Sequence, residues 1–182
     1  MQGIYFFTFT IKKMVTKKDI IAPEFPMRYI NIVKQEDVVK AIKRNGYQFK
    51  RFLEKVPKKK INYAYADGKW TVKELLRHII DAERVFTYRA LCFARKDAST
   101  LPGFDENNWA LNAQTIHRKW DDLADEFKAV RKSTELLFES FTDEQLLSSG
   151  TVSNYTINVV ALGFMTAGHV EHHMRIITER YL

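Results

Sequence analysis

Residues 156–180 read TINVVALGFMTAGHVEHHMRIITER, and this stretch decides the fold. Apolar residues recur in it at spacings of three and four, which predicts a helix of about seven turns with one face toward a core. That face carries Val159, Leu162, Thr166, His169, His173 and Ile177. The pattern therefore predicts a long buried helix whose histidines point inward.

His169 and His173 lie four residues apart, so their side chains sit one above the other, roughly 6 Å apart. Two imidazoles at this spacing can reach one metal ion at about 2.0 to 2.1 Å, although such pairs also occur as ordinary core packing. His78 stands in a second apolar helical stretch, LLRHII at residues 75–80. It is the third histidine of an expected open metal site. His172 could ligate in place of His173, but the spacing favours a role in the pocket wall.

Three further helical patterns precede the last one, at residues 36–56, 71–95 and 118–141. Gly46 interrupts the first pattern at a cost of about 1 kcal/mol relative to alanine. Thr71 and Glu74 form a capping-box signature that marks the start of the second. The sequence TDE at residues 142–144 ends the third. Together with residues 156–180, these patterns predict an all-α four-helix bundle.

The connection between the second and third helices, residues 96–117, is long for a helix pair. Because short loops join antiparallel neighbours, a long crossover indicates that these two helices run in the same direction. The expected topology is up-down-down-up, with the second and fourth helices antiparallel. His78 lies near the start of one and His173 near the end of the other, so both should lie at the same end of the bundle.

The 182 residues, 46% of them hydrophobic, are enough for one domain with a full core. We expect a bundle domain over residues 31–182 and an N-terminal arm or extension over residues 1–30. The apolar residues 4–11 fit a short strand, an arm or an extension upstream of a start at Met14, and they fit neither a signal peptide nor a membrane span. The single cysteine, Cys92, excludes an intrachain disulfide framework and favours the cytoplasm.

The net charge of +7 is concentrated in the first third of the chain. Residues 1–60 hold 15 basic against 5 acidic residues, whereas residues 61–182 hold 14 against 17. The basic part has no zinc-finger spacing, recognition helix or basic-aromatic stacking pattern. We therefore interpret the lysines as solvated and expect no nucleic-acid partner.

From residue 36 to residue 181 the chain resembles the DinB-like superfamily of metal-binding four-helix bundles. The resemblance rests on KWTVKELLRH at residues 69–78, PGFD at residues 102–105 and GHVEHH at residues 168–173. Members of that family use one histidine of the second helix and both histidines of an H-x-x-x-H pair on the fourth. The resemblance thus implies that His78, His169 and His173 are the metal ligands, and that the chain could pair as a homodimer.

The activities known in that family are diverse, and three hypotheses follow. The first is S-transfer in stress detoxification, in which a low-molecular-weight thiol such as bacillithiol attacks an electrophilic small molecule. The second is a metal-dependent hydrolase, which the missing H-E-x-x-H glutamate disfavours. The third is a non-enzymatic metal-binding stress protein. Three imidazoles suit zinc, nickel or iron, and the nucleophile of either reaction would be a metal-bound water or thiolate.

Residues outside the histidine set have simpler expected roles. Cys92 is expected to be a core thiol too far from His78 to be a ligand, and His117 an exposed residue. Arg89 lies about 16 Å beyond His78 along the helix and is expected to pair with an acidic neighbour.

Asp105 could orient a histidine or touch substrate, or simply cap the turn before Trp109. Gly163 and Gly168 are expected to allow close helix approach near the ion, and Glu171 is expected to face away from the site.

Overall fold

The computed structural model describes residues 15–182, and the expected segment at residues 4–11 lies outside this range. The elements are η1 (Lys17–Asp19), α1 (Glu24–Ile30), α2 (Val38–Leu53), η2 (Lys58–Lys60), α3 (Val72–Ala94), α4 (Glu106–Asn112), η3 (Thr115–His117), α5 (Trp120–Ser140), α6 (Asp143–Leu147), β1 (Ser149–Val152), β2 (Tyr155–Asn158) and α7 (Val159–Arg180). The four long helices are those expected, each within a few residues of its predicted range.

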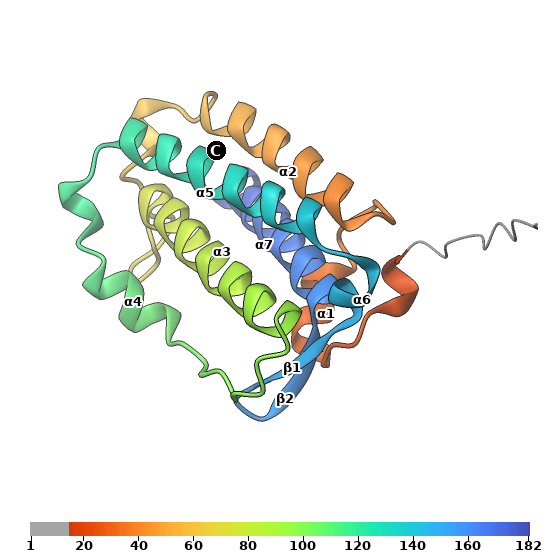
Figure 1. Cartoon of the computed structure of the whole chain (residues 1–182). Coiled ribbons are helices and arrows are strands. Elements are labelled where there is room, and N and C mark those ends of the chain that lie inside the picture. The colour runs from red at the N-terminus through yellow and green to blue at the C-terminus, as the bar shows by residue number, and fades with distance from the viewer. Residues whose placement is uncertain (1–14) are drawn as a thin grey trace, which may run out of the picture.

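The long helices α2, α3, α5 and α7 form a four-helix bundle (Figure 1). In the picture α2 and α7 run one way, and α3 and α5 run the other way, so the order is up-down-down-up. Both α5 and α7 pack against α2 and α3. The predicted topology, including the parallel pair joined by a crossover, is confirmed.

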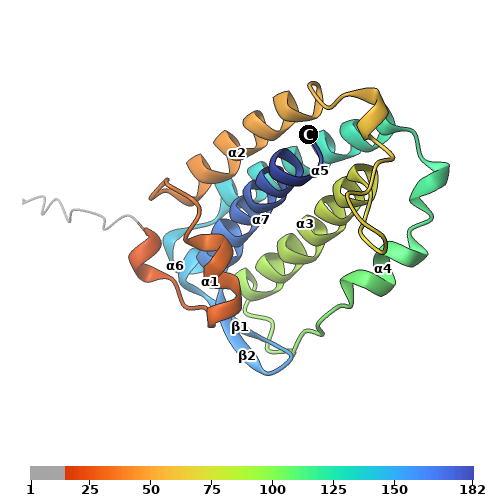
Figure 2. The same cartoon turned by 180° about the vertical axis from the view of Figure 1, so that it is seen from behind.

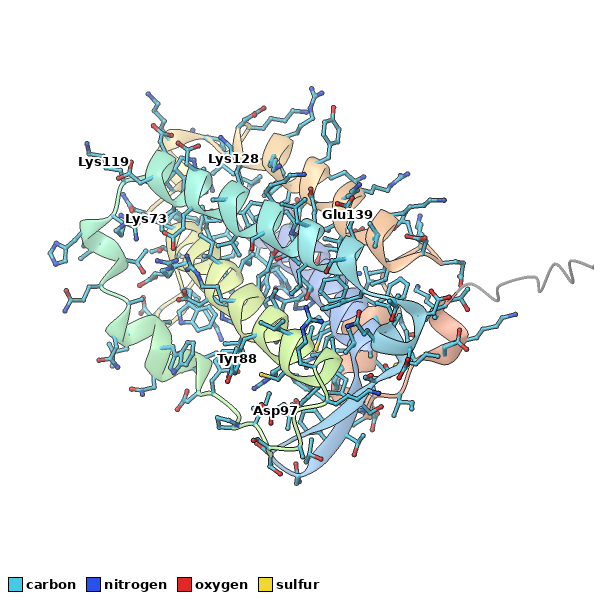
Figure 3. The ribbon with its side chains drawn as sticks, in the orientation of Figure 1. Lys73, Tyr88, Asp97, Lys119, Lys128 and Glu139 are labelled. Atoms are coloured by element: carbon cyan, nitrogen blue, oxygen red, sulfur yellow. The ribbon has the colours of Figure 1, made fainter. Side chains whose placement is uncertain are left out.

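The crossover between α3 and α5 passes along the outside of the bundle and contains the short helix α4 (Figures 1 and 2). Asp105 caps α4 by accepting hydrogen bonds from the backbone N–H groups of Asn107 and Asn108. Lys73 lies in the first turn of α3 and is labelled in Figure 3. Its ammonium donates to the carbonyl of Arg118, near the far end of the crossover, at 3.3 Å. The Lys73 contact thus fastens the end of the crossover to the first turn of α3.

The fourth helix begins at Val159 instead of Thr156, because residues 149–158 form a two-stranded antiparallel hairpin. Ser153 has a positive φ of 51° in the turn, and the β-branched residues on either side suit strands. Asn158 then caps α7 by accepting from the Ala161 N–H. The same side chain accepts from the Ile21 N–H and donates to the Asp19 carbonyl, so it also fastens the N-terminal segment.

The N-terminal residues from Val15 onward pack on the bundle, and α1 lies against α7 (Figure 2). At Gly168 a Cβ would come within 2.0 Å of the Tyr29 carbonyl oxygen, so only glycine lets the two helices approach this closely. Gly163 similarly faces Val38 and Phe138, and a Cβ added there would lie 2.4 Å from a methyl group of Val38. The close approach expected at both glycines is confirmed, and its relation to an ion stays a prediction. The domain boundary at residue 30 stays a prediction.

The middle of the bundle holds a buried ion pair between Arg131 of α5 and Glu83 of α3. The guanidinium donates to both carboxylate oxygens, at 2.8 and 2.7 Å, and also to the Ile42 carbonyl and the Asn45 amide oxygen. Gly46 leaves room for it, because a Cβ there would lie 2.8 Å from the Arg131 Cγ. The glycine that interrupts the helical pattern of α2 is therefore a packing requirement, and α2 is continuous through it.

Candidate metal centre

Three histidines converge between α3 and α7. The Nε2 atom of His169 lies 3.0 Å from Nε2 of His78 and 3.1 Å from Nε2 of His173. One ligand atom from each of the three residues lies within 4.8 Å of the others. The antiparallel course of α3 and α7 brings the residues to the same height, as the sequence predicted.

Hydrogen bonding alone cannot satisfy this cluster. Nε2 of a neutral imidazole carries either one proton or one lone pair, so the His169 Nε2 cannot make two good hydrogen bonds to its neighbours. Tetrahedral coordination at about 2.05 Å per bond would place the nitrogens about 3.3 Å apart, close to the separations seen. The donor set and its spacing therefore fit a transition metal ion.

The surroundings keep the three imidazoles neutral. Burial lowers the pKa of His78 to about 4. Burial also holds the pKa values of His169 and His173 well below the ordinary value, and the neighbouring histidines lower them further. A neutral imidazole is the form that binds metal, so the site is ready to bind an ion at neutral pH.

Aromatic side chains enclose the histidines. The ring centre of Trp70 lies 4.9 Å from that of His78. The ring centres of Tyr29 and Phe86 lie 5.3 and 5.5 Å from that of His169. The Nδ1 atom of His173 is buried and has no hydrogen-bond partner among residues 15–182. Its second nitrogen thus lacks the acceptor that usually orients a ligating histidine. Asp105, which was one candidate for such an acceptor, caps α4 instead.

A cavity of about 400 Å³ opens beside the histidines. Its lining comes from α1, α3, the crossover with α4, β2 and α7. A second cavity, of about 290 Å³, touches the same site and shares Trp70, His172 and His173 with the first. His172 lies on the wall of both cavities and outside the cluster of three nitrogens.

Two lining residues differ from their expected roles. Arg89 was expected to pair with an acidic neighbour away from the site, but it lines the larger cavity and donates to the Pro102 carbonyl at 2.7 Å. The expectation was wrong because a long arginine side chain leans toward the N-terminus of its helix, back toward His78. Glu106 also lines this cavity, and its charge acts on His78. Glu106 was not predicted from the sequence, although it directly follows the PGFD motif.

The segment before the bundle contributes Phe25, Arg28 and Tyr29 to the larger cavity. Residues 1–30 were predicted only as an arm or extension, so this contribution was not predicted; the proline pattern at positions 23 and 26 was the available sign of a short helix. Two other residues lie where they were predicted. Cys92 is a buried free thiol, and His117 is exposed in η3.

The chain matches the family model of the DinB superfamily over residues 41–177 and belongs to that family. A protein of Oceanobacillus iheyensis named "Putative metal-dependent hydrolase OB0413" is 28% identical over 116 residues. This match covers 63% of the chain and 66% of the relative, just under two thirds of the relative's length.

Two solved structures share the fold. YfiT from Bacillus subtilis, described as a probable metal-dependent hydrolase with an unusual four-helix bundle topology, superposes with a TM-score of 0.65. Its identity is 18%, with 87% of each chain covered. A mycothiol-dependent maleylpyruvate isomerase gives a TM-score of 0.64 at 12% identity, covering 76% of this chain and 58% of the isomerase. Within residues 15–182, no helix has both the length and the apolar character needed to cross a bilayer.

Proposed function

We propose that this DinB superfamily protein holds one divalent transition metal ion through His78, His169 and His173, with zinc or nickel preferred and iron compatible. The observation that carries the proposal is the convergence of three Nε2 atoms beside an open cavity. Neutral imidazoles add no charge to the ion, so it would keep its full positive charge. When bound, such an ion lowers the pKa of a thiol or a water toward neutrality.

We infer that the reaction is S-transfer from a low-molecular-weight thiol to an electrophilic small molecule. Two cavities meet at the histidines, which provides room for two reactants. In the overall reaction a sulfur–carbon bond forms, the bond to the leaving group breaks with its electron pair, and the thiol proton is released. The chain positions the reactants, and the aromatic walls around the histidines supply apolar surface for an electrophile.

Hydrolysis is the second candidate, and Glu106 is the observation that favours it. This carboxylate lines the larger cavity close enough to act on His78 electrostatically. A carboxylate in that place can accept a proton from an attacking water, the role for which the sequence offered no residue. The Glu106→Gln variant separates the two reactions, because it should reduce ester hydrolysis by roughly 100-fold or more while sparing S-transfer to a halide electrophile.

The first test is metal analysis of the purified protein by plasma mass spectrometry. We expect about one equivalent of metal per chain in the wild type and none in the triple variant His78→Ala, His169→Ala, His173→Ala. His173→Ala should lose more metal than the matched control His172→Ala. Absence of metal after reconstitution with zinc or nickel would overturn the proposal, and the reverse order of the two single variants would reassign the ligand.

The second test is product formation by the metal-loaded protein. Bacillithiol and 1-chloro-2,4-dinitrobenzene serve as the thiol and the electrophile, and the thioether is measured by liquid chromatography. We expect turnover that depends on His78, His169 and His173. Turnover of p-nitrophenyl acetate without thiol would favour hydrolysis, and stoichiometric metal without either product would leave a non-enzymatic metal-binding protein.

A further inference from the structure

Arg89 is a buried charge at the wall of the larger cavity. Only 4% of its surface is exposed, and one Nη donates to the Pro102 carbonyl. Among residues 15–182 it has no carboxylate within ion-pair distance. A buried guanidinium without a counter-ion is costly, so its presence next to an open cavity calls for an explanation.

The neighbours of Arg89 form a distinct end of the cavity. Tyr155 of β2 lies close enough to act on the guanidinium electrostatically, and the Phe104 ring centre lies 5.9 Å from its central carbon. Both residues line the cavity with Arg89. A phenol and a guanidinium that share one wall can both donate hydrogen bonds to a single oxyanion.

The other charges in the cavity lie nearer the histidines. Arg28 acts electrostatically on His169, and Glu106 acts on His78. Along α3, Phe86 lies between His78 and Arg89, and on α7 Met165 lies one turn before His169. Both are apolar residues of the lining, so the cavity of about 400 Å³ offers apolar wall between Arg89 and the histidines, with Arg28 and Glu106 on the histidine side.

We propose that this cavity binds a small organic acid, with its carboxylate at Arg89 and Tyr155 and its apolar body along Phe86 and Met165. The opposite end of the molecule then faces the histidines. That the end facing the histidines is the one that reacts rests on the proposed function. Binding of the carboxylate at Arg89 does not require the metal. Arg89 is a binding residue in this scheme and sets which substrates are accepted.

The test measures binding of 4-phenylbutanoate and its neutral analogue 4-phenylbutanamide to chelator-treated protein by calorimetry. We expect the acid to bind roughly tenfold or more tightly than the amide in the wild type. Arg89→Gln should abolish this preference, and Arg89→Lys should keep part of it because the charge remains. Arg95→Gln, at the exposed end of the same helix, is the matched control and should behave as wild type. Circular dichroism confirms that each variant is folded.

Three results would overturn the proposal: equal affinities for acid and amide in the wild type, an undiminished preference in folded Arg89→Gln, or a preference lost only in Arg28→Gln. A preference that appears only after metal is added would show that the carboxylate binds the ion instead of Arg89. Because the main measurement is made without metal, failure of the metal proposal would leave its result unchanged.

Discussion

The Arg131–Glu83 pair and the three histidines are both buried polar clusters, and Glu83 lies only five residues after His78 on α3. In the first cluster the two charges neutralise each other, and the guanidinium makes further bonds to Ile42 and Asn45. In the second cluster three neutral rings turn their Nε2 atoms toward one another, and hydrogen bonds between the rings cannot pair all of these atoms. We call the first the satisfied cluster because both of its charges are paired, although the Asn45 Nδ2 beside them is buried without a partner among residues 15–182. It holds the helices together, while the unsatisfied cluster of histidines is available to a ligand.

The largest effect is expected when the satisfied cluster is broken. Glu83→Ala leaves Arg131 buried without a counter-charge and should destabilise the protein by about 3 to 5 kcal/mol, measured by urea unfolding. Glu144→Ala, which removes the partner of exposed Lys96, is the control and should have no measurable effect. Equal losses in both variants would contradict the distinction between the buried pair and the surface pair.

The second effect concerns the histidines and pH. In the metal-free protein the folded pKa of His78 is about 4, below the unfolded value of 6.5, so the unfolded chain binds more protons once the pH falls below about 6.5. The free energy of unfolding should therefore decrease as the pH is lowered from 6.5 to 4, and His78 alone should account for up to about 3 kcal/mol of the decrease. Urea unfolding at several pH values measures the slope.

His78→Gln is the control for this slope, because glutamine does not titrate. Its stability should depend less steeply on pH over the same interval. Identical slopes for the two proteins would show that His78 is not buried in its neutral form.

The third effect tests how tightly the satisfied cluster is packed. Gly46→Ala would stabilise an unconstrained helix by about 1 kcal/mol. Here the new methyl group meets Arg131, so we expect a loss of about 1 to 3 kcal/mol in thermal or urea unfolding. Arg44→Ala, two residues earlier on the exposed side of α2, should change stability little. A more stable Gly46→Ala protein would show that Arg131 can move aside.

The smallest effect is expected when both partners of the ion pair are replaced together. Glu83→Leu with Arg131→Met removes two charges and fills the space, and stability should stay within about 1 kcal/mol of the wild type. Metal content, measured on the same sample, should also be unchanged. A loss as large as that of Glu83→Ala would mean that the pair stabilises the bundle beyond mutual neutralisation.

Long-range periodicity explains why most of the fold could be predicted from the sequence. The four long helices, the capping box at Thr71 and the parallel pair follow from apolar spacing and loop length. The rise of about 1.5 Å per residue then places His78 and His173 at the same level along the bundle axis. These features depend on regular geometry, which a sequence pattern records directly.

Features that depend on tertiary contact could not be predicted in the same way. Arg89 enters the cavity because of the direction of a long side chain, and Glu106 because the crossover folds back on α3. The hairpin at residues 149–158 is too short for its alternation to stand out from the start of a helix. α1 lies within the site because Gly168 allows it to approach α7, which becomes visible only when the two helices are seen together.

The contact between Tyr29 and Gly168 makes the segment before the family-matched region part of the candidate metal centre. Residues 41–177 contain all three histidines, yet one wall of their cavity comes from α1. A chain without α1 would keep all three histidines, but one side of the cavity and the face of α7 at Gly168 would be open to solvent. Loss of this short helix would thus change the size and polarity of the cavity without changing the nitrogens beside it.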